Sequence, residues 1–201
     1  MRSSVHPIEV ESYAILRTRL DTTDLPSLTR AVVERVVHTS ADPSWAGDLV
    51  CDEAALRAGR DALLAGAPLV TDVRMVAVGI TARPSTVALD LAGAPESGRT
   101  RSAAGIRAAV EQFPDGAVWA IGNAPTALAE LLRCAEAGLV RTPLVVGLPV
   151  GFVGSVAAKA ALRAAGRGGW VGGTVSNRSE RGGAAAAAAA VNALLYSEES
   201  A

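Results

Sequence analysis

The chain contains two histidines, and only His38 ends a run of residues with helical periodicity. His38 belongs to the segment VVHT at residues 36–39, whereas His6 lies in an N-terminal stretch that we expect to be frayed. Imidazole is the only side chain with an unperturbed pKa near neutrality, so His38 is the candidate for acid–base chemistry. A lone histidine at a helix end is more often a partner of the helix dipole, which leaves a structural role open.

The composition is that of one globular domain built from small apolar side chains. The chain has 201 residues, of which 50% are hydrophobic and only 3% aromatic, so the core must consist mainly of Ala, Val, Leu and Ile. A net charge of −1 supplies no field that would attract nucleic acid, and scarce aromatics remove the usual platform for stacking bases. We therefore expect no nucleic-acid partner.

Cysteine usage and apolar stretches indicate a reduced compartment without membrane insertion. Cys51 and Cys134 are too few for a disulfide framework and form no C-x-x-C motif, so we expect two buried, reduced thiols and no metal site. The most apolar stretch, residues 143–158, is interrupted by glycines and is shorter than the roughly 20 residues of a membrane span. The first thirty residues show no secretory signal. We expect a soluble cytoplasmic protein.

The elements that must position His38 are helices in the first third of the chain. Periodicity predicts a helix over residues 8–17 and a second one, ending near residue 37, that Asp24 or Ser27 could cap. Residues 42–48 read as a loop, and a third helix is expected over residues 53–64, where Gly66 would end it.

After residue 66 the pattern changes to short apolar runs that alternate with helical patterns. The predicted strands cover residues 68–72, 85–89, 117–121, 144–147 and 170–175, and the predicted helices cover residues 101–112, 126–137, 154–165 and 184–196. This alternation predicts an α/β fold, with a parallel sheet covered by helices on both faces. The alanine run at residues 184–190 favours a packed terminal helix because Ala is the best helix former.

Ligands of such sheets collect at the carboxyl ends of the strands. Three turns are unusual there: residues 122–126 carry Asn123, residues 147–154 are rich in glycine, and Arg181-Gly182-Gly183 precedes the last helix. Arg101 adds a cation at another helix start, where it would suit a ligand carboxylate or pair with an acid elsewhere. The fold class is also typical of enzymes that bind a dinucleotide cofactor, but no G-x-G-x-x-G follows the first predicted strand.

The order of these turns resembles the precorrin-8X methylmutase family of cobalamin biosynthesis. The specific strings are IGNAPTAL at residues 121–128 and GLPVGFVG at residues 147–154, with Lys159 downstream. Further agreement in order and spacing comes from residues 12–17 (SYAILR), from the VVH segment ending at His38, from residues 65–69 with Asp72, and from residues 101–104 (RSAA). The similarity covers nearly the whole chain.

The resemblance implies a single three-layer α/β/α domain over residues 1–201 that acts as a homodimer without a cofactor. It implies an isomerase that moves a methyl group from C-11 to C-12 of a polycarboxylated corrinoid precursor, giving hydrogenobyrinate, or its cobalt counterpart in the anaerobic route. His38 corresponds to the family histidine that protonates the ring. The expected substrate-binding residues are Ser12, Tyr13, Thr81, Arg101, Asn123, Arg181, Gly182 and Gly183.

Several family positions differ in this chain. The segment at residues 179–184 (SERGGA) places Glu180 where the family has arginine, and Arg181 follows one residue later. Ala157-Ala158, Glu9 and Val78 also depart from the family pattern. Glu9 and Glu180 would repel a polyanionic substrate unless they point to solvent. The departures leave a second function open, that of a tetrapyrrole carrier that has kept the pocket without catalysis.

Overall fold

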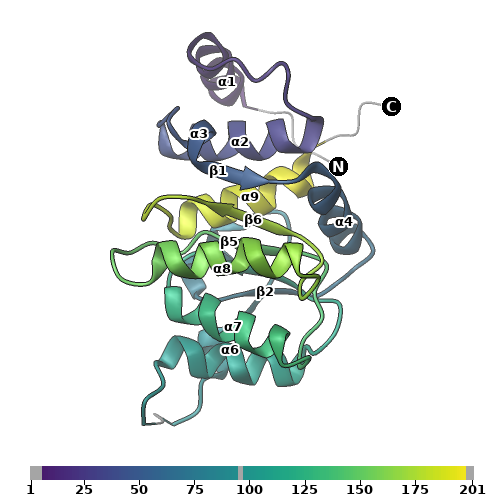
Figure 1. Cartoon of the computed structure of the whole chain (residues 1–201). Coiled ribbons are helices and arrows are strands. Elements are labelled where there is room, and N and C mark those ends of the chain that lie inside the picture. Colours follow the sequence, from purple (N-terminus) through teal and green to yellow (C-terminus); the bar gives the residue numbers. More distant parts are fainter. Residues whose placement is uncertain (1–5, 95–96, 198–201) are drawn as a thin grey trace.

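The computed structural model describes residues 6–94 and 97–197, which form one sheet with helices on both faces (Figure 1). In chain order the strands are β1 (Leu49–Cys51), β2 (Leu69–Thr71), β3 (Thr86–Val87), β4 (Val118–Ile121), β5 (Val145–Gly147) and β6 (Thr174–Asn177). Their spatial order is β1-β6-β5-β4-β2-β3, and every pairing is parallel except that of the edge strand β1 with β6. The predicted α/β fold with a mostly parallel sheet is confirmed. The predicted domain limits, residues 1 and 201, lie outside the described residues.

Two hydrophobic cores lie on the two faces of the sheet. The helices are α1 (Pro7–Arg19), α2 (Ser27–Ser40), α3 (Trp45–Asp48), α4 (Glu53–Leu64), α5 (Arg74–Gly79), the 3₁₀ helix η1 (Ala88–Leu91), α6 (Arg101–Gln112), α7 (Pro125–Glu136), α8 (Ser155–Arg167) and α9 (Ala184–Tyr196). In β4, Trp119 and Ile121 pack against α6, α7 and α8, whereas Val118 and Ala120 face the core formed by α4, α5 and α9. Both faces of β4 are therefore buried, which explains its continuous apolar run.

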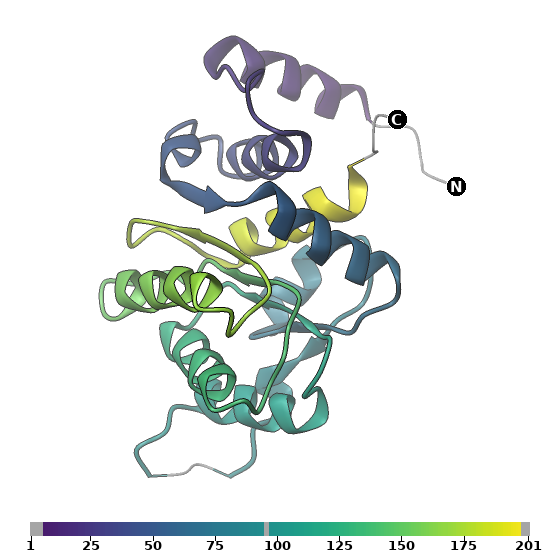
Figure 2. The ribbon, with the colours of Figure 1, turned by 45° about the vertical axis from the view of Figure 1, so that its right-hand side comes forward.

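The alanine-rich helix α9 is packed between the sheet and α2. Ala186 to Ala190 are buried, and a Cβ at Gly122 would lie 2.8 Å from the Cβ of Ala187. Only small side chains allow so close an approach of helix and sheet. Helices α2 and α1 lie outside α9, at the end of the molecule opposite α6, as both ribbon views show (Figures 1 and 2). The prediction of a packed terminal helix is confirmed.

The last strand is shifted from its predicted place. Residues 170–175 were expected to form it, but β6 begins only at Thr174 and ends at Asn177. Gly172 and Gly173 lie before the strand, packed closely against residues 142 and 143: Gly172 N donates to Thr142 O at 2.8 Å, and a Cβ at either glycine would collide with neighbouring atoms. The strand continues into polar residues whose buried side chains are hydrogen-bonded, a feature that an apolar pattern does not reveal.

Other predicted boundaries in the N-terminal half are also corrected. His6 is not frayed, because its Nδ1 accepts a hydrogen bond from Ile8 N and caps α1. Neither Asp24 nor Ser27 caps α2; the Glu53 carboxylate accepts from the N–H groups of residues 28 and 29 instead. The predicted loop 42–48 contains α3, and the predicted strand 85–89 becomes η1 after two residues. Gly66 does end α4, with a φ of 94°.

Candidate functional site

His38 lies in the last turns of α2, partly buried against α1. The hydroxyl of Ser12 is 2.9 Å from His38 Nδ1, and the ring of Tyr13 stacks on the imidazole with centroids 4.8 Å apart and an interplanar angle of 9°. The serine hydroxyl can donate to Nδ1 of the neutral ring or accept from the protonated ring. These contacts orient the imidazole, and Nε2 is the nitrogen through which it would exchange a proton with a ligand.

The relative position of α1 and α2 is set mainly by charged pairs, since Leu16 is the buried residue of α1. Glu34 is 3% exposed and accepts from Arg17 at 2.8 Å and from the Thr22 hydroxyl at 2.6 Å. Burial alone would raise the pKa of Glu34, but these hydrogen bonds outweigh burial and lower it. Glu9, one of the departures from the family pattern, is paired with Arg35 at 3.1 Å, so its charge is compensated within the chain.

A hollow of about 100 Å³ lies beside the imidazole. Its lining is Ser12, Ile15, Leu16, Arg19, Val37, His38, Ala41 and Pro43. The hollow is mostly apolar and carries one cation, Arg19, at its edge. It is too small to enclose a macrocycle, so a large ring could present only an edge to His38.

The carboxylate of Asp72 occupies the topological switch point of the sheet, where the strand order reverses between β2 and β4. In chain order the five parallel strands have the arrangement 2-1-3-4-5, for which ligands commonly bind between the first and third strands. Asp72, directly after β2, is 1% exposed and accepts from the N–H groups of Gly122 at 3.1 Å, Asn123 at 2.8 Å and Ala124 at 3.2 Å. An internal anion therefore fills the backbone position that would hold a nucleotide phosphate. This arrangement disfavours the hypothesis that the protein is a dinucleotide-dependent enzyme.

Asp72 was not predicted as a site residue, although it holds the turn that carries Asn123. The signal is present in the sequence: α7 begins after Ala124, which has no capping side chain, and an acid directly follows the neighbouring strand. The side chain of Asn123 lies on an exposed turn. Burial raises the pKa of Asp72 and the backbone hydrogen bonds oppose that rise.

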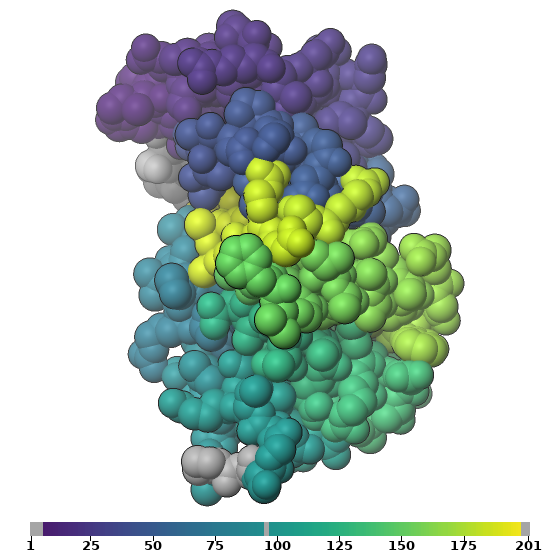
Figure 3. All heavy atoms as spheres, turned by 60° about the vertical axis from the view of Figure 1, so that its left-hand side comes forward, coloured from purple at the N-terminus to yellow at the C-terminus, as the bar shows by residue number. Residues whose placement is uncertain are grey.

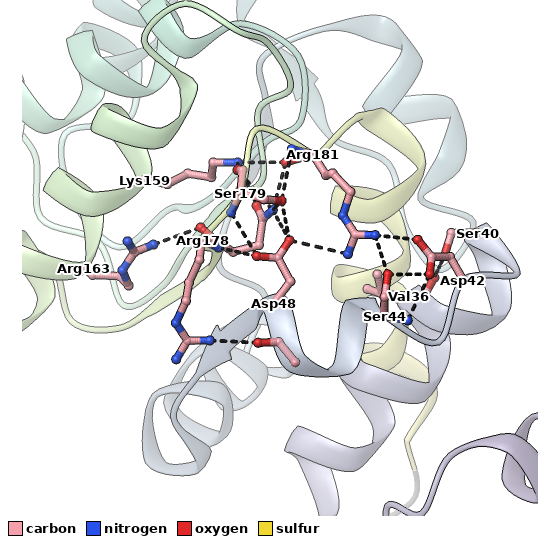
Figure 4. Close-up of polar contacts among 12 residues, drawn as sticks. Val36, Ser40, Asp42, Ser44, Asp48, Lys159, Arg163, Arg178, Ser179 and Arg181 are labelled. Atoms are coloured by element: carbon pink, nitrogen blue, oxygen red, sulfur yellow. Dashed lines mark hydrogen bonds and ion pairs between the residues drawn. The ribbon is translucent and has the colours of Figure 1, made fainter.

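The turn that precedes α9 is held by a cluster of buried polar groups (Figure 4). Lys159 is fully buried, and its ammonium donates to Asn177 Oδ1 at 2.9 Å, to Arg181 O at 2.8 Å and to Ser179 O. Burial lowers the pKa of Lys159 to about 8. Gly182 is required here, because a Cβ would lie 2.3 Å from Leu148 O. Sequence reasoning noted Lys159 only as part of the family pattern.

Asp48 forms the second centre of this cluster. Its carboxylate accepts from Arg178 N at 2.8 Å, from Ser179 N at 2.9 Å, from the Ser179 hydroxyl at 2.6 Å and from Asn177 Nδ2 at 2.8 Å. Burial alone would raise the pKa of Asp48, but the hydrogen bonds outweigh it and lower the pKa to about 2.

Asp48 is expected to make the protein sensitive to acid. A carboxyl with a lowered folded-state pKa stabilises the fold above its unfolded-state pKa, and this stability is lost as the pH falls from about 4 to 2. Urea unfolding should show that Asp48→Asn is less stable than the wild type at pH 6. The difference in free energy of unfolding between the two proteins should shrink by about 2 kcal/mol as the pH is lowered to 2. The control is Asp115→Asn, since Asp115 is 70% exposed. A gap that does not change with pH would contradict this assignment.

The structure brings together some of the predicted site residues and separates others. Ser12, Tyr13 and His38 meet between α1 and α2, whereas Arg101 is the exposed first residue of α6 on the opposite face of the sheet. Thr81 lies along the C-terminal half of α9, with its hydroxyl 3.0 Å from the Tyr196 hydroxyl. Within one chain, His38 and Arg101 are therefore in different layers.

One face of the molecule gathers the loops at the carboxyl ends of the strands. In Figure 3 the turn after α2 (blue), the start of α9 (yellow) and the loop after β5 (green) lie side by side on this face. Gly183 N donates to Leu148 O at 2.9 Å, and Gly151 N donates to Glu180 O at 3.1 Å, so the α9 turn and the β5 loop are joined directly. The side chain of Glu180 is exposed.

A family model described as precorrin-8X methylmutase matches residues 7–197. The chain belongs to the precorrin-8X methylmutase family. A precorrin-8X methylmutase from Pseudomonas aeruginosa is 39% identical over 199 residues and covers 94% of each chain. A cobalt-precorrin-8 methylmutase from Synechocystis is 35% identical over 178 residues, 78% of this chain and 82% of the relative. The crystal structure of the Thermus thermophilus precorrin-8X methylmutase superposes with a TM-score of 0.82 at 32% identity, over 94% of this chain and 96% of that one.

Membership in the precorrin-8X methylmutase family confirms the predicted resemblance. The protein is an isomerase of cobalamin biosynthesis, in which the family catalyses a methyl migration on the corrin precursor. Relatives named cobalt-precorrin-8 methylmutase and relatives named precorrin-8X methylmutase match at similar identity, so both the cobalt-containing and the cobalt-free substrate agree with these comparisons.

The remaining sequence-based expectations concern thiols, metals and membranes. Cys134 is buried and Cys51 partly buried, and both are free thiols; burial raises the pKa of Cys51 to about 11. Among residues 6–94 and 97–197, no cluster of three His, Cys, Asp or Glu side chains could hold a metal ion. No helix in the same part of the chain has the length and apolar character required to span a bilayer.

Proposed function

We propose that this chain moves the methyl group of precorrin-8X from C-11 to C-12, giving hydrogenobyrinate, with His38 as the proton donor to the ring. The observation that carries the proposal is the imidazole held by Ser12 and Tyr13 at a partly buried position in a chain of this family. A methyl shift within one molecule requires no external nucleophile and no cofactor. It requires a donor that titrates near neutrality and a site that holds the ring still.

The chain offers groups that suit a flat ring with many carboxylate arms. We assign ring contacts to Ser12 and Tyr13 near the donor, and carboxylate contacts to Arg101 and to the Gly182–Gly183 turn at the start of α9. The N–H of Gly182 is the candidate donor in this turn, because the N–H of Gly183 already donates to Leu148 O. Thr81 and Asn123 would supply neutral hydrogen bonds. The second predicted arginine, Arg181, has its guanidinium engaged by Asp42, Ser44 and Asp48.

Turnover of precorrin-8X, followed by its change in absorption spectrum, tests the function directly. Conversion to a product with the spectrum of hydrogenobyrinate supports the isomerase. Binding of the ring without conversion by the wild-type protein would instead support the carrier function. Parallel assays with the cobalt-containing substrate decide between the two routes. We place the reaction in the cytoplasm, without nucleic-acid or membrane partners.

We further propose that the working unit is a homodimer, because His38 and Arg101 lie on opposite faces of the sheet in one chain. Arg101→Ala is expected to weaken ring binding by about 1.5–3 kcal/mol, the loss of one charged hydrogen bond. If the site combines His38 of one copy with Arg101 of the other, mixing the His38→Ala and Arg101→Ala proteins, with subunit exchange and with substrate below the wild-type KM, should restore part of the wild-type rate. The mass of the protein in solution, measured by sedimentation, shows whether it is a dimer. A mixture no more active than its parts would place both residues in one chain's site.

A further inference from the structure

The guanidinium of Arg181 joins the turn before α9 to the turn that follows the His38 helix. Its Nη1 donates to Asp42 Oδ2 and to the Ser44 hydroxyl at 2.7 Å, and its Nη2 lies 3.5 Å from Asp48 Oδ2. The same group lies over the ring of Trp45, 4.6 Å from its centroid. In Figure 4 this side chain extends away from Lys159 toward Asp42 and Ser44.

Both ends of this contact are themselves held in place. Asp42 accepts from Ser44 N at 2.9 Å and from the Ser44 hydroxyl at 2.6 Å, and Ala41 before it has a φ of 53°, which ends α2. On the other side, Lys159 holds the carbonyl oxygen of Arg181 at 2.8 Å. Asp42 is four residues after His38, and Arg181 is directly before Gly182. The contact therefore connects the end of the His38 helix to the glycine turn.

The charges around Arg181 make it a poor partner for a ligand carboxylate. Two carboxylates, Asp42 and Asp48, already face the guanidinium, and Trp45 covers one of its faces. An added carboxylate would have to displace Asp42 or lie close to it, where like charges repel. The guanidinium is thus committed to contacts within the chain.

We propose that the Arg181–Asp42 pair is a positioning clamp that holds the His38 helix at a set distance from the Gly182–Gly183 turn. This inference rests on the proposed function, in which His38 protonates a ring whose carboxylates the turn binds. Arg181 acts through the backbone and through Asp42, and not by contact with the substrate. Misplacement of a donor by about 1 Å is enough to cost on the order of 10²-fold in rate.

A double-mutant cycle of Asp42→Asn, Arg181→Met and the double variant tests the clamp. Each single variant should lower kcat by about 10- to 100-fold, and the double variant should be no worse than the worse single one, because both remove the same contact. Ring affinity, measured by titration with the corrin product, should change by less than about threefold. Arg178→Met is the matched control, since Arg178 carries the same charge in the same loop and contacts Gly47 O instead.

Amide hydrogen exchange tests the clamp independently of turnover. Exchange in the last turn of α2, residues 36–41, should speed up in Asp42→Asn and in Arg181→Met, and remain at the wild-type rate in Arg178→Met. This readout stands even if precorrin-8X is not the substrate. The clamp is overturned if Arg181→Met alone weakens ring binding more than tenfold, if the two kcat effects multiply, or if exchange at residues 36–41 is unchanged.

Discussion

The His38→Ala variant is expected to have a kcat about 10²- to 10⁴-fold below that of the wild type, while it retains most of its affinity for the ring. The imidazole is needed when a ring nitrogen takes up its proton in the transition state, whereas docking depends on the carboxylate contacts elsewhere. Single-turnover absorbance with precorrin-8X measures the rate, and titration with the corrin product measures binding. The loss should appear in kcat and in kcat/KM to a similar extent.

The chain offers a matched control for this prediction in its other histidine. His6 caps α1 through Ile8 N, so His6→Ala should keep wild-type kcat and lose only a little stability. Ser12→Ala removes the contact to Nδ1 and should reduce kcat less than His38→Ala does, because the Tyr13 stack remains. A His38→Ala protein that turns over at the wild-type rate would remove His38 from the chemistry.

The parts of the fold that follow from sequence are those in which a local pattern and burial agree. The alternation of apolar runs with helical patterns predicts β2, β4 and β5 close to their places, and α9 with both of its ends, because these elements are buried. The edge strand β3 is half-buried and only two residues long, so the predicted strand 85–89 is too long. The strand β6 escapes this logic, since Ser176 and Asn177 are buried polar residues satisfied by Arg163 and Lys159. The short elements β1, α3 and α5 carry too few residues to show a period.

The site could be predicted as a list of residues but not as an arrangement. His38 is singled out by its chemistry, and Ser12 by the family pattern, yet their contact joins residues 26 positions apart on two helices. The pairing of Arg181 with Asp42 spans 139 positions, and no local pattern encodes it. The sequence therefore indicated Arg181 as a substrate-binding cation, whereas long-range packing determines what its guanidinium contacts.

The loss of the Lys159 ammonium is expected to destabilise the fold strongly. Lys159→Met keeps roughly the length and volume of the side chain but removes the charge that faces three acceptors, the oxygens of residues 177, 179 and 181. A lost hydrogen bond to a charged donor costs about 1.5–3 kcal/mol, and Asn177 Nδ2 still donates to the oxygens of residues 179 and 181. We therefore expect a total loss of about 3–5 kcal/mol, which is roughly 10 °C in Tm for a chain of this size. Urea unfolding at pH 6.5, where the ammonium with its lowered pKa of about 8 is still protonated, measures the change.

Arg163→Met, one turn further along α8, is the control for the stability loss expected in Lys159→Met. Arg163 donates to Ser176 Oγ at 3.1 Å and to Asn177 O at 2.9 Å from a partly exposed position, so water can replace it and the expected loss is about 1 kcal/mol. A large gap between the two variants means that the turn before α9 depends on an internal cation. Equal losses would mean that solvent reaches the carbonyl oxygens once the ammonium is gone, and that the turn keeps its place through the contacts of Gly183 with Leu148 and of Ser179 with Asp48.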